Sequence, residues 1–274
     1  MNVSFAYDGY GRRVSMTDSS GTTSYDYDIR NRMTKKTTPI GKITYTHTNG
    51  LLTGISSNNV NGVSLTYGYD TQSRLQEVTD NKLNKTTNYD YWANGSLKSC
   101  TYPNQIQHNW KYNSRNRLTN LTIKNATTNT VFKSFAYTVG TSGNRTKVVE
   151  DTGREINWTY DSLYRLTQEN ITNEPNDING VVDYTYDKVG NRQTRTSTLA
   201  GVSNQDFAGA YDDNDRLLAA DYSYDDNGST TQKPGGWAYT YDAENKLLTA
   251  SNATTTISYV YDGDGNRAGV FQRI

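Results

Sequence analysis

The chain is poor in apolar residues and carries no net charge. Hydrophobic residues make up 33% of its 274 residues, against ~45–50% in an average domain, so it lacks the aliphatic material for a thick core. Disordered chains share this lack, but they also have few aromatics and high net charge. This chain instead has 23 Tyr, 4 Trp and 5 Phe at zero formal net charge. The composition therefore predicts a thin folded structure stabilised by aromatic rings, which bring a large buried area and, in tyrosine, a polar group.

Other residues and segments are scarce as well. A net charge of zero gives no electrostatic reason to bind nucleic acid or a membrane surface. The single cysteine, Cys100, cannot form a disulfide within the chain. No apolar run approaches the ~20 residues of a membrane span, and residues 1–6 lack the basic and apolar regions of a signal peptide. We therefore expect no nucleic-acid partner, no membrane span and no signal peptide in this chain.

What the chain does have is one short pattern in tandem. Each copy centres on a tyrosine, and successive copies lie 13 to 26 residues apart, within the period range of repeat proteins. These anchor tyrosines are Tyr7, Tyr27, Tyr45, Tyr69, Tyr91, Tyr112, Tyr137, Tyr160, Tyr186, Tyr211, Tyr224, Tyr241 and Tyr261. No linker or composition shift interrupts them, so we expect a single domain over residues 1–274 with about thirteen repeats. Because the pattern runs to both ends, we expect a fragment of a longer protein.

The residues before each anchor follow the period of a β-strand. An aromatic or branched residue stands two positions earlier, as at Phe5, Tyr25 and Trp110, and only the Tyr211 repeat, with Gly209, departs from this. A period of two places both rings on one face of a sheet. Small or polar residues between them, such as Thr185 and Thr240, then face the other way.

The residues after each anchor are typical of a tight turn. Aspartate follows the tyrosine in nine repeats, namely Asp8, Asp28, Asp70, Asp161, Asp187, Asp212, Asp225, Asp242 and Asp262. Its carboxylate can accept hydrogen bonds from backbone N–H groups of the turn. Three residues later comes Gly, Asn or Asp, at Gly11, Asn31, Asn49, Gly95, Asn116, Gly190, Asp215, Gly228, Asn245 and Gly265. These residue types adopt the left-handed conformation that closes a short hairpin loop.

Each repeat is therefore predicted to be strand, turn, strand. A two-stranded hairpin is only marginally stable alone, so the hairpins must pair edge to edge. The predicted fold is all-β, with tandem hairpins in a long continuous antiparallel sheet, which twist would curve. The residues predicted to anchor it are Tyr7, Tyr27, Tyr69, Tyr160, Tyr186, Tyr211, Tyr241 and Tyr261, with Asp8, Asp28, Asp70, Asp161, Asp187 and Asp242, and Gly11, Gly190 and Gly265.

The motif Tyr-Asp-x-x-Gly-Asn-Arg, found at residues 186–192 and 261–267, resembles the YD repeat. This repeat occurs in bacterial Rhs and wall-associated proteins, in the B and C components of Tc toxins and in teneurins. The resemblance implies that the curved sheet of this chain forms a spiralling β-strip or partial hollow shell. Such a shell encloses an unfolded cargo in the toxins and supports cell–cell recognition in teneurins. It also implies a bacterial parent protein that is secreted or held at the cell surface.

From this resemblance we expect a structural segment without catalytic residues, cofactor or metal, whose cargo or recognition domain is encoded elsewhere in the parent protein. Its partners would be neighbouring shell segments and an unfolded polypeptide. The alternative is a module that binds carbohydrate or a cell surface through aromatic troughs. Unpaired strand edges also predict edge-to-edge self-association.

Three weaker motifs favour structural explanations. Residues 151–153, Asp-Thr-Gly, copy the signature of aspartic proteases but have no second copy, so we expect a turn. Residues 262–266 resemble the start of a calcium loop but lack its later glycine and glutamate. Cys100 and His108 could form a thiol–imidazole pair, yet no residue that would orient them is evident. With only His47 as a further histidine, zinc is also disfavoured.

Overall fold

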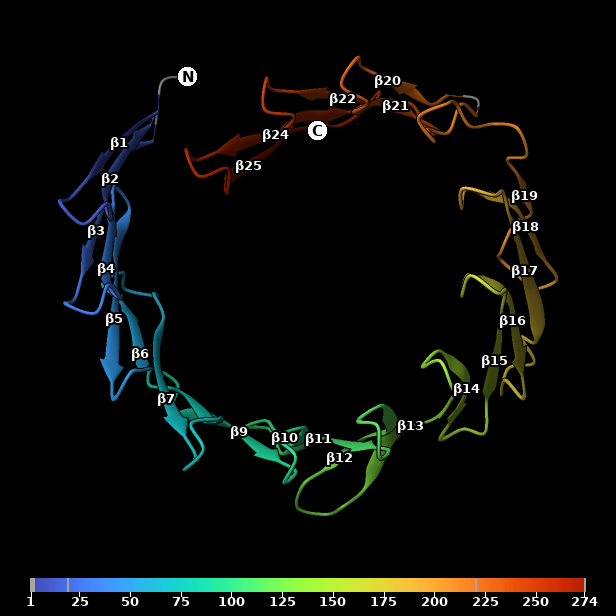
Figure 1. The fold of residues 1–274 in the computed structure, drawn as a ribbon, viewed down its shortest axis with the longest axis horizontal. Coiled ribbons are helices and arrows are strands. Elements are labelled where there is room, and N and C mark those ends of the chain that lie inside the picture. Colours follow the sequence, from blue (N-terminus) through green and yellow to red (C-terminus); the bar gives the residue numbers. More distant parts are fainter. Residues whose placement is uncertain (1–2, 19, 220, 274) are drawn as a thin grey trace. The chain divides into compact units, whose positions relative to one another are not determined.

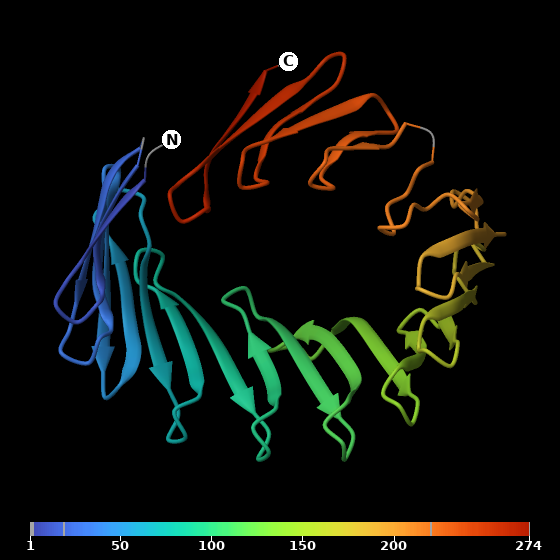
Figure 2. The ribbon, with the colours of Figure 1, turned by 45° about the horizontal axis from the view of Figure 1, so that its top comes forward.

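The computed structural model describes residues 3–18, 20–219 and 221–273. These residues contain strands and turns, and no helix lies among them. The chain divides into two compact units, one made of residues 1–63 and 210–274 and the other of residues 64–209. Figures 1 and 2 show the ribbon from two directions.

The first unit combines the first six and the last six strands. The early strands are β1 (Ser4–Tyr7), β2 (Arg13–Asp18), β3 (Gly21–Tyr27), β4 (Met33–Thr38), β5 (Gly41–Thr48) and β6 (Leu51–Ser57). The late strands are β20 (Ser223–Tyr224), β21 (Thr230–Lys233), β22 (Trp237–Tyr241), β23 (Leu247–Ser251), β24 (Thr256–Tyr261) and β25 (Arg267–Arg273), which form a six-stranded sheet.

The second unit contains thirteen strands. They are β7 (Ser64–Tyr69), β8 (Leu75–Asp80), β9 (Lys85–Tyr91), β10 (Leu97–Thr101), β11 (Ile106–Tyr112), β12 (Leu118–Asn125), β13 (Val131–Val139), β14 (Arg145–Glu150), β15 (Glu155–Tyr160), β16 (Leu166–Thr172), β17 (Gly180–Tyr186), β18 (Arg192–Ser197) and β19 (Gln205–Asp206). Each pairs antiparallel with the next, and within this unit the strip follows an arc (Figure 1). The prediction of tandem antiparallel hairpins is confirmed.

Most repeats carry the same irregularity beside the anchor tyrosine. In the β3–β4 pair, Asp26 faces Lys35 but Tyr27 faces Met33, so the return strand holds one extra residue. The same step occurs before Tyr69, Tyr112, Tyr160, Tyr186, Tyr241 and Tyr261. Such a β-bulge increases the local twist of a strand pair. The ring-bearing strand keeps its strict alternation, because the extra residue lies on the other strand.

The interior is thin, as the low apolar content predicts. The buried apolar residues among those described are Met16, Tyr25, Cys100, Val148, Ile171, Val182 and Ala250. The opposite face carries threonine pairs that bond across strands, for example Thr185 with Thr194 and Thr240 with Thr249. Rings on one face and hydroxyls on the other therefore replace a conventional core.

One repeat is irregular, and its sequence shows why. Tyr211, whose repeat has Gly209 in place of the second ring, pairs with Leu217 in an isolated bridge outside the named strands. Without the paired ring, the strand that precedes the turn in other repeats is missing here.

Candidate functional site

The Tyr-Asp turn is the unit from which any site of this chain is built, and the Asp28 turn shows its geometry. Asp28 Oδ1 accepts hydrogen bonds from the backbone N–H groups of Arg30 (2.8 Å) and Arg32 (3.0 Å). Its Oδ2 accepts one from Arg32 Nε at 2.8 Å. The backbone N–H of Asp28 donates to the Arg32 carbonyl, which closes the loop. The aspartate thus satisfies the turn's own backbone groups.

The same pattern recurs through both units. The carboxylates that accept from the backbone N–H four residues later are those of Asp8, Asp70, Asp161, Asp187, Asp212, Asp225, Asp242 and Asp262. The hydrogen bond from the Arg32 side chain, followed by that from its backbone, lowers the pKa of Asp28 to about 2. The Asp28 carboxylate is therefore held as a hydrogen-bonded anion in its turn.

The closing residue of each turn is left-handed, as its residue type predicts. All ten predicted positions have positive φ, for example 76° at Gly11, 61° at Asn31 and 60° at Asp215. Two turns use residues that are poorly suited to this conformation, Ser73 at 62° and Tyr164 at 61°. A side chain at such a φ crowds the backbone, which glycine avoids.

The arginine of the turn reaches forward to the next repeat. Arg165 donates from Nε to Asp161 at 2.6 Å and from Nη1 to the carbonyl of Asp187 at 2.7 Å. Its guanidinium carbon lies 4.8 Å from the ring centroid of Tyr186, within cation–π range. Equivalent stacking pairs are Arg12 with Tyr27, Arg74 with Tyr91 and Arg216 with Tyr224. Each arginine therefore connects its own turn to the following tyrosine.

The anchor tyrosine reaches back in the other direction. Tyr186 donates its hydroxyl hydrogen to the carbonyl of Leu166, on the return strand of the preceding repeat, at 2.8 Å. The same link joins Tyr27 to Arg13, Tyr91 to Leu75, Tyr160 to Arg145, Tyr224 to Leu217, Tyr241 to Thr230 and Tyr261 to Leu247. Burial raises the pKa of Tyr186, so the phenol keeps its proton for this bond.

Sequence reasoning missed both inter-repeat links. It treated the tyrosines as packing groups and the arginines as residues that begin the return strand. The available signal was that a basic residue in the turn is followed, one repeat later, by a tyrosine at the anchor position. The two links give the turn arginine and the anchor tyrosine of the pattern a bonding role between neighbouring repeats.

The rings two positions before the anchors are mostly half-buried. Only Phe5 is exposed, and only Tyr25 is fully buried, at 3% exposure. Among the anchors, only Tyr7 is exposed. Most rings thus lie against neighbouring repeats rather than lining an open aromatic groove.

The weaker motifs are also placed by the structure. Residues 151–153 form a turn in which Gly153 donates to the Glu150 carbonyl, as predicted. Cys100 and His108 do lie opposite each other in the β10–β11 pair, but burial raises the pKa of Cys100, which disfavours a reactive thiolate. His108 packs edge-on against Tyr102 and Trp110.

Few features of the described residues suggest a small-ligand site. Over the described ranges, no group of three or more His, Cys, Asp or Glu side chains is placed to hold a metal ion. An open pocket of about 470 Å³ lies beside two turns of the second unit and is lined by Trp92, Ala93, Asn94, Lys111, Tyr112 and Asn113. Trp92 is 40% exposed there.

The tandem Tyr-Asp turns and their links match a known family along the chain. The family model of the teneurin YD-shell matches residues 1–270. This chain belongs to the teneurin YD-shell family. The resemblance drawn from the Tyr-Asp motif is therefore confirmed.

Solved structures show the same fold as this YD-shell chain. The crystal structure of TcdB2-TccC3-TEV is 16% identical with a TM-score of 0.77, and that of TcdB2-TccC3 is 15% identical with the same TM-score. Each alignment covers 97% of this chain and 17% of the toxin chain. The likeness establishes the shell fold of the Tc toxins for this chain.

Curated relatives match a shorter stretch. The tRNA nuclease WapA of Bacillus subtilis and the tRNA3(Ser)-specific nuclease WapA of Bacillus spizizenii are both 34% identical over 102 residues. That stretch is 35% of this YD-shell chain and only 4% of either nuclease.

The described residues also contain no helix long and apolar enough to span a membrane.

Proposed function

We propose that this YD-shell chain is a non-catalytic wall segment of a larger shell, which encloses or displays a cargo or recognition domain encoded elsewhere in its parent protein. Its partners are the neighbouring shell segments and an unfolded polypeptide, and the parent protein is secreted or displayed on a cell surface. The chain contributes a stiff, continuous sheet to the shell, and internal hydrogen bonds between its repeats provide the stiffness.

The repeated tyrosine-to-carbonyl link carries this proposal. Tyr91, Tyr160 and Tyr186 each direct their hydroxyl into the preceding repeat, at 2.7 to 2.8 Å. A tyrosine used for recognition would leave its hydroxyl free for a ligand, as aromatic-rich binding surfaces do. These anchor hydroxyls instead join one repeat to the next, which supports a structural role for the sheet.

A combination of hydrogen exchange and glycan-array binding on the purified chain tests the proposal. A wall predicts slow exchange of the strand amides from β7 to β18 and no glycan binding. Incubation with tRNA serves as the catalytic control, because the WapA relatives are named as nucleases. Cleavage of tRNA by the chain, at a rate above that of a heat-denatured sample, would overturn the non-catalytic assignment.

A second candidate is carbohydrate binding at the pocket beside Trp92. An exposed indole flanked by the amides of Asn94 and Asn113 offers a stacking surface and hydrogen-bonding groups. Array binding that is lost in Trp92→Ala but kept in Trp158→Phe would favour this function. Trp158 is a suitable control because it is half-buried and does not line this pocket.

A further inference from the structure

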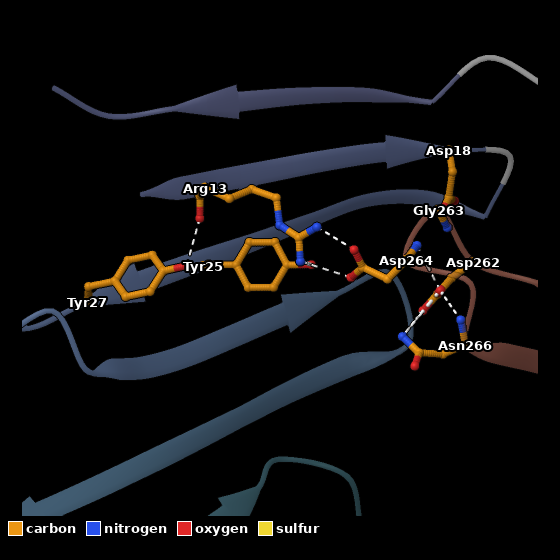
Figure 3. Close-up of polar contacts among 8 residues, drawn as sticks. All are labelled: Arg13, Asp18, Tyr25, Tyr27, Asp262, Gly263, Asp264 and Asn266. Carbon is orange, nitrogen blue, oxygen red and sulfur yellow. Dashed lines mark hydrogen bonds and ion pairs between the residues drawn. The ribbon is translucent and has the colours of Figure 1, made fainter. Parts of the chain in front are cut away.

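Among the Tyr-Asp turns in the described part of the chain, one bonds to residues about 250 positions away. Within the first unit, the turn at residues 262–266, which joins β24 to β25, lies against strands β2 and β3 (Figure 3). The bonded residues are 245 and 251 positions apart in sequence. This contact is therefore a tertiary one and is independent of the strand ladder.

Two polar interactions hold the turn in place. The guanidinium of Arg13 bonds both carboxylate oxygens of Asp264, with Nη2 at 2.9 Å from Oδ2. The backbone N–H of Gly263 donates to Asp18 Oδ2 at 2.9 Å. Figure 3 shows Arg13 pointing at the Asp264 carboxylate beside the ring of Tyr25. A two-pronged arginine–carboxylate pair fixes orientation as well as distance.

The surface that receives the turn contains two of the most buried side chains among the described residues. Met16 is 2% exposed and Tyr25 is 3% exposed, whereas the other rings two positions before an anchor are half-buried or exposed. Arg13 lies 4.7 Å from the Tyr25 ring centroid and Nη2 donates to its hydroxyl at 3.2 Å. Arg13 is thus pre-positioned by Tyr25 before it meets Asp264.

The fit also requires the absence of a side chain at residue 263. A Cβ on Gly263 would lie 2.6 Å from Val3 Cγ1 and 3.0 Å from Met16 Sδ, although its φ is outside the left-handed range. Gly9 occupies the same position in its own turn and would meet nothing within 4 Å. The glycine at 263 is therefore required for close approach rather than for backbone conformation.

The sequence of this turn differs from those of the other Tyr-Asp turns of the chain at the positions that make the contact. Counting the turn aspartate as position one, Asp264 is at position three. The other eight turns place Tyr10, Arg30, Gln72, Leu163, Val189, Asn214, Asn227 and Glu244 there. Arg13 occupies position six of the first turn, where Met33, Leu75, Leu166, Leu217 and Leu247 stand in five others.

We propose that Val3, Arg13, Met16, Asp18 and Tyr25 form a docking surface for a Tyr-Asp turn with glycine at position two and aspartate at position three, and that the 262–266 turn of the same chain occupies it. We call this pair of elements the clasp. The clasp fixes the C-terminal hairpins on the N-terminal hairpins of the first unit, so that their spacing is set by a selective contact rather than by strand twist alone. It goes beyond the wall function, which would stand if the clasp failed.

The polar contacts of the clasp depend on the ionised carboxylates of Asp264 and Asp18. The Arg13 side chain lowers the pKa of Asp264, and the Ser20 side chain, followed by Gly263, lowers that of Asp18. The groups that face Asp264 are Arg13 on β2, Tyr25 on β3, Lys36 on β4 and Asp262 in its own turn. A carboxylate whose pKa is lowered by folding contributes stability above its unfolded pKa and loses it as the pH falls through its folded pKa. The ion pair therefore stabilises the clasp fully above the unfolded pKa of Asp264, and this contribution is lost as the pH falls through the lowered pKa of the folded state.

Pulsed electron paramagnetic resonance between two spin labels tests the clasp. The labels are placed on cysteines introduced at the exposed positions Ile29 and Phe271, in a Cys100→Ala background, and the labelled protein is diluted with unlabelled chain. The expected result is one narrow distance distribution that persists on dilution. Gly263→Val and Asp264→Asn are expected to broaden it at pH 7.

Matched substitutions separate the clasp from general damage to a turn. Ser162→Val changes position two of another turn, and Glu244→Gln changes the acidic residue at position three of the preceding turn; both are expected to leave the distribution narrow. A distribution that stays narrow in Gly263→Val and Asp264→Asn would overturn the proposal. Loss of the narrow distance on dilution would also overturn it, because the turn would then dock on a second copy.

Discussion

Replacing Tyr164 with glycine should stabilise the second unit. Tyr164 closes the Asp161 turn with a φ of 61°, a conformation that costs an L-residue roughly 1–2 kcal/mol. Its side chain is 62% exposed, so little packing is lost when it is removed. Glycine restores the freedom to adopt this φ but gains roughly 0.5–1 kcal/mol of entropy in the unfolded chain. The difference predicts a stabilisation of about 0.5–1 kcal/mol.

The neighbouring residue supplies the control. Leu163 is 65% exposed and lies in the same turn, but its φ is not positive. Leu163→Gly should therefore destabilise the turn by about 0.5–1 kcal/mol, because only the entropic cost remains. Tyr164→Asn should fall between wild type and Tyr164→Gly, since asparagine tolerates the left-handed region.

Native-state hydrogen exchange is the appropriate assay, because it reports the local opening of a single turn. The reporter is the amide of Asp161, which donates to the Arg165 carbonyl at 3.0 Å and closes the turn. Exchange of this amide should slow about two- to fivefold in Tyr164→Gly and quicken by a similar factor in Leu163→Gly. Equal effects of the two substitutions would refute the argument from backbone strain.

Three further predictions concern the links, the turns and the thin interior. Tyr186→Phe should destabilise the β16–β17 region by about 1 kcal/mol through loss of one hydrogen bond, whereas Tyr184→Phe should have little effect. The urea unfolding midpoints of the two variants compare these effects, and equal shifts of the midpoint would contradict the link. The Asp28 carboxyl should titrate near pH 2 in a carbon-detected NMR titration. Because its pKa is lowered by folding, the stability that it contributes should be present above pH 4 and be lost as the pH falls towards 2. A titration midpoint near 4 would refute the turn geometry. Ile171→Ala, at a residue 5% exposed, should cost about 2 kcal/mol in thermal or urea unfolding, and a cost below about 0.5 kcal/mol would show that the thin interior does not depend on it.

The sequence was sufficient for features that repeat and insufficient for features that occur once. The hairpins follow from the alternation before each anchor, and the left-handed residues follow from types such as Gly11 and Asn31, which recur at a fixed offset. The pairing of neighbouring hairpins could be foreseen, but the tyrosine links could not, because the hydroxyl's partner is a backbone carbonyl, which no side-chain pattern reveals. The roles of the anchor residues in stability and the predicted single domain over residues 1–274 stay predictions.

The clasp shows why the remainder could not be foreseen. Gly263 and Gly9 occupy the same position of the same motif, yet only one is packed against another segment. The sequence around Asp264 suggested the beginning of a calcium loop, while its carboxylate in fact pairs with Arg13. Contacts between residues about 250 positions apart leave no local period to detect, and edge-to-edge self-association likewise stays a prediction.

The tyrosine-to-carbonyl link also has a consequence for how such a chain can change in length. In seven repeats the hydroxyl of the anchor tyrosine donates to a carbonyl at the start of the preceding return segment, as in Tyr186 and Leu166. Because this donor and this acceptor recur, removing or duplicating one whole repeat between linked neighbours rejoins a matching pair. A cut within a repeat leaves one of them without its counterpart. Length variation in this strip is therefore tolerated in whole repeats, and a variant lacking one complete repeat should fold while a variant lacking half of one should not.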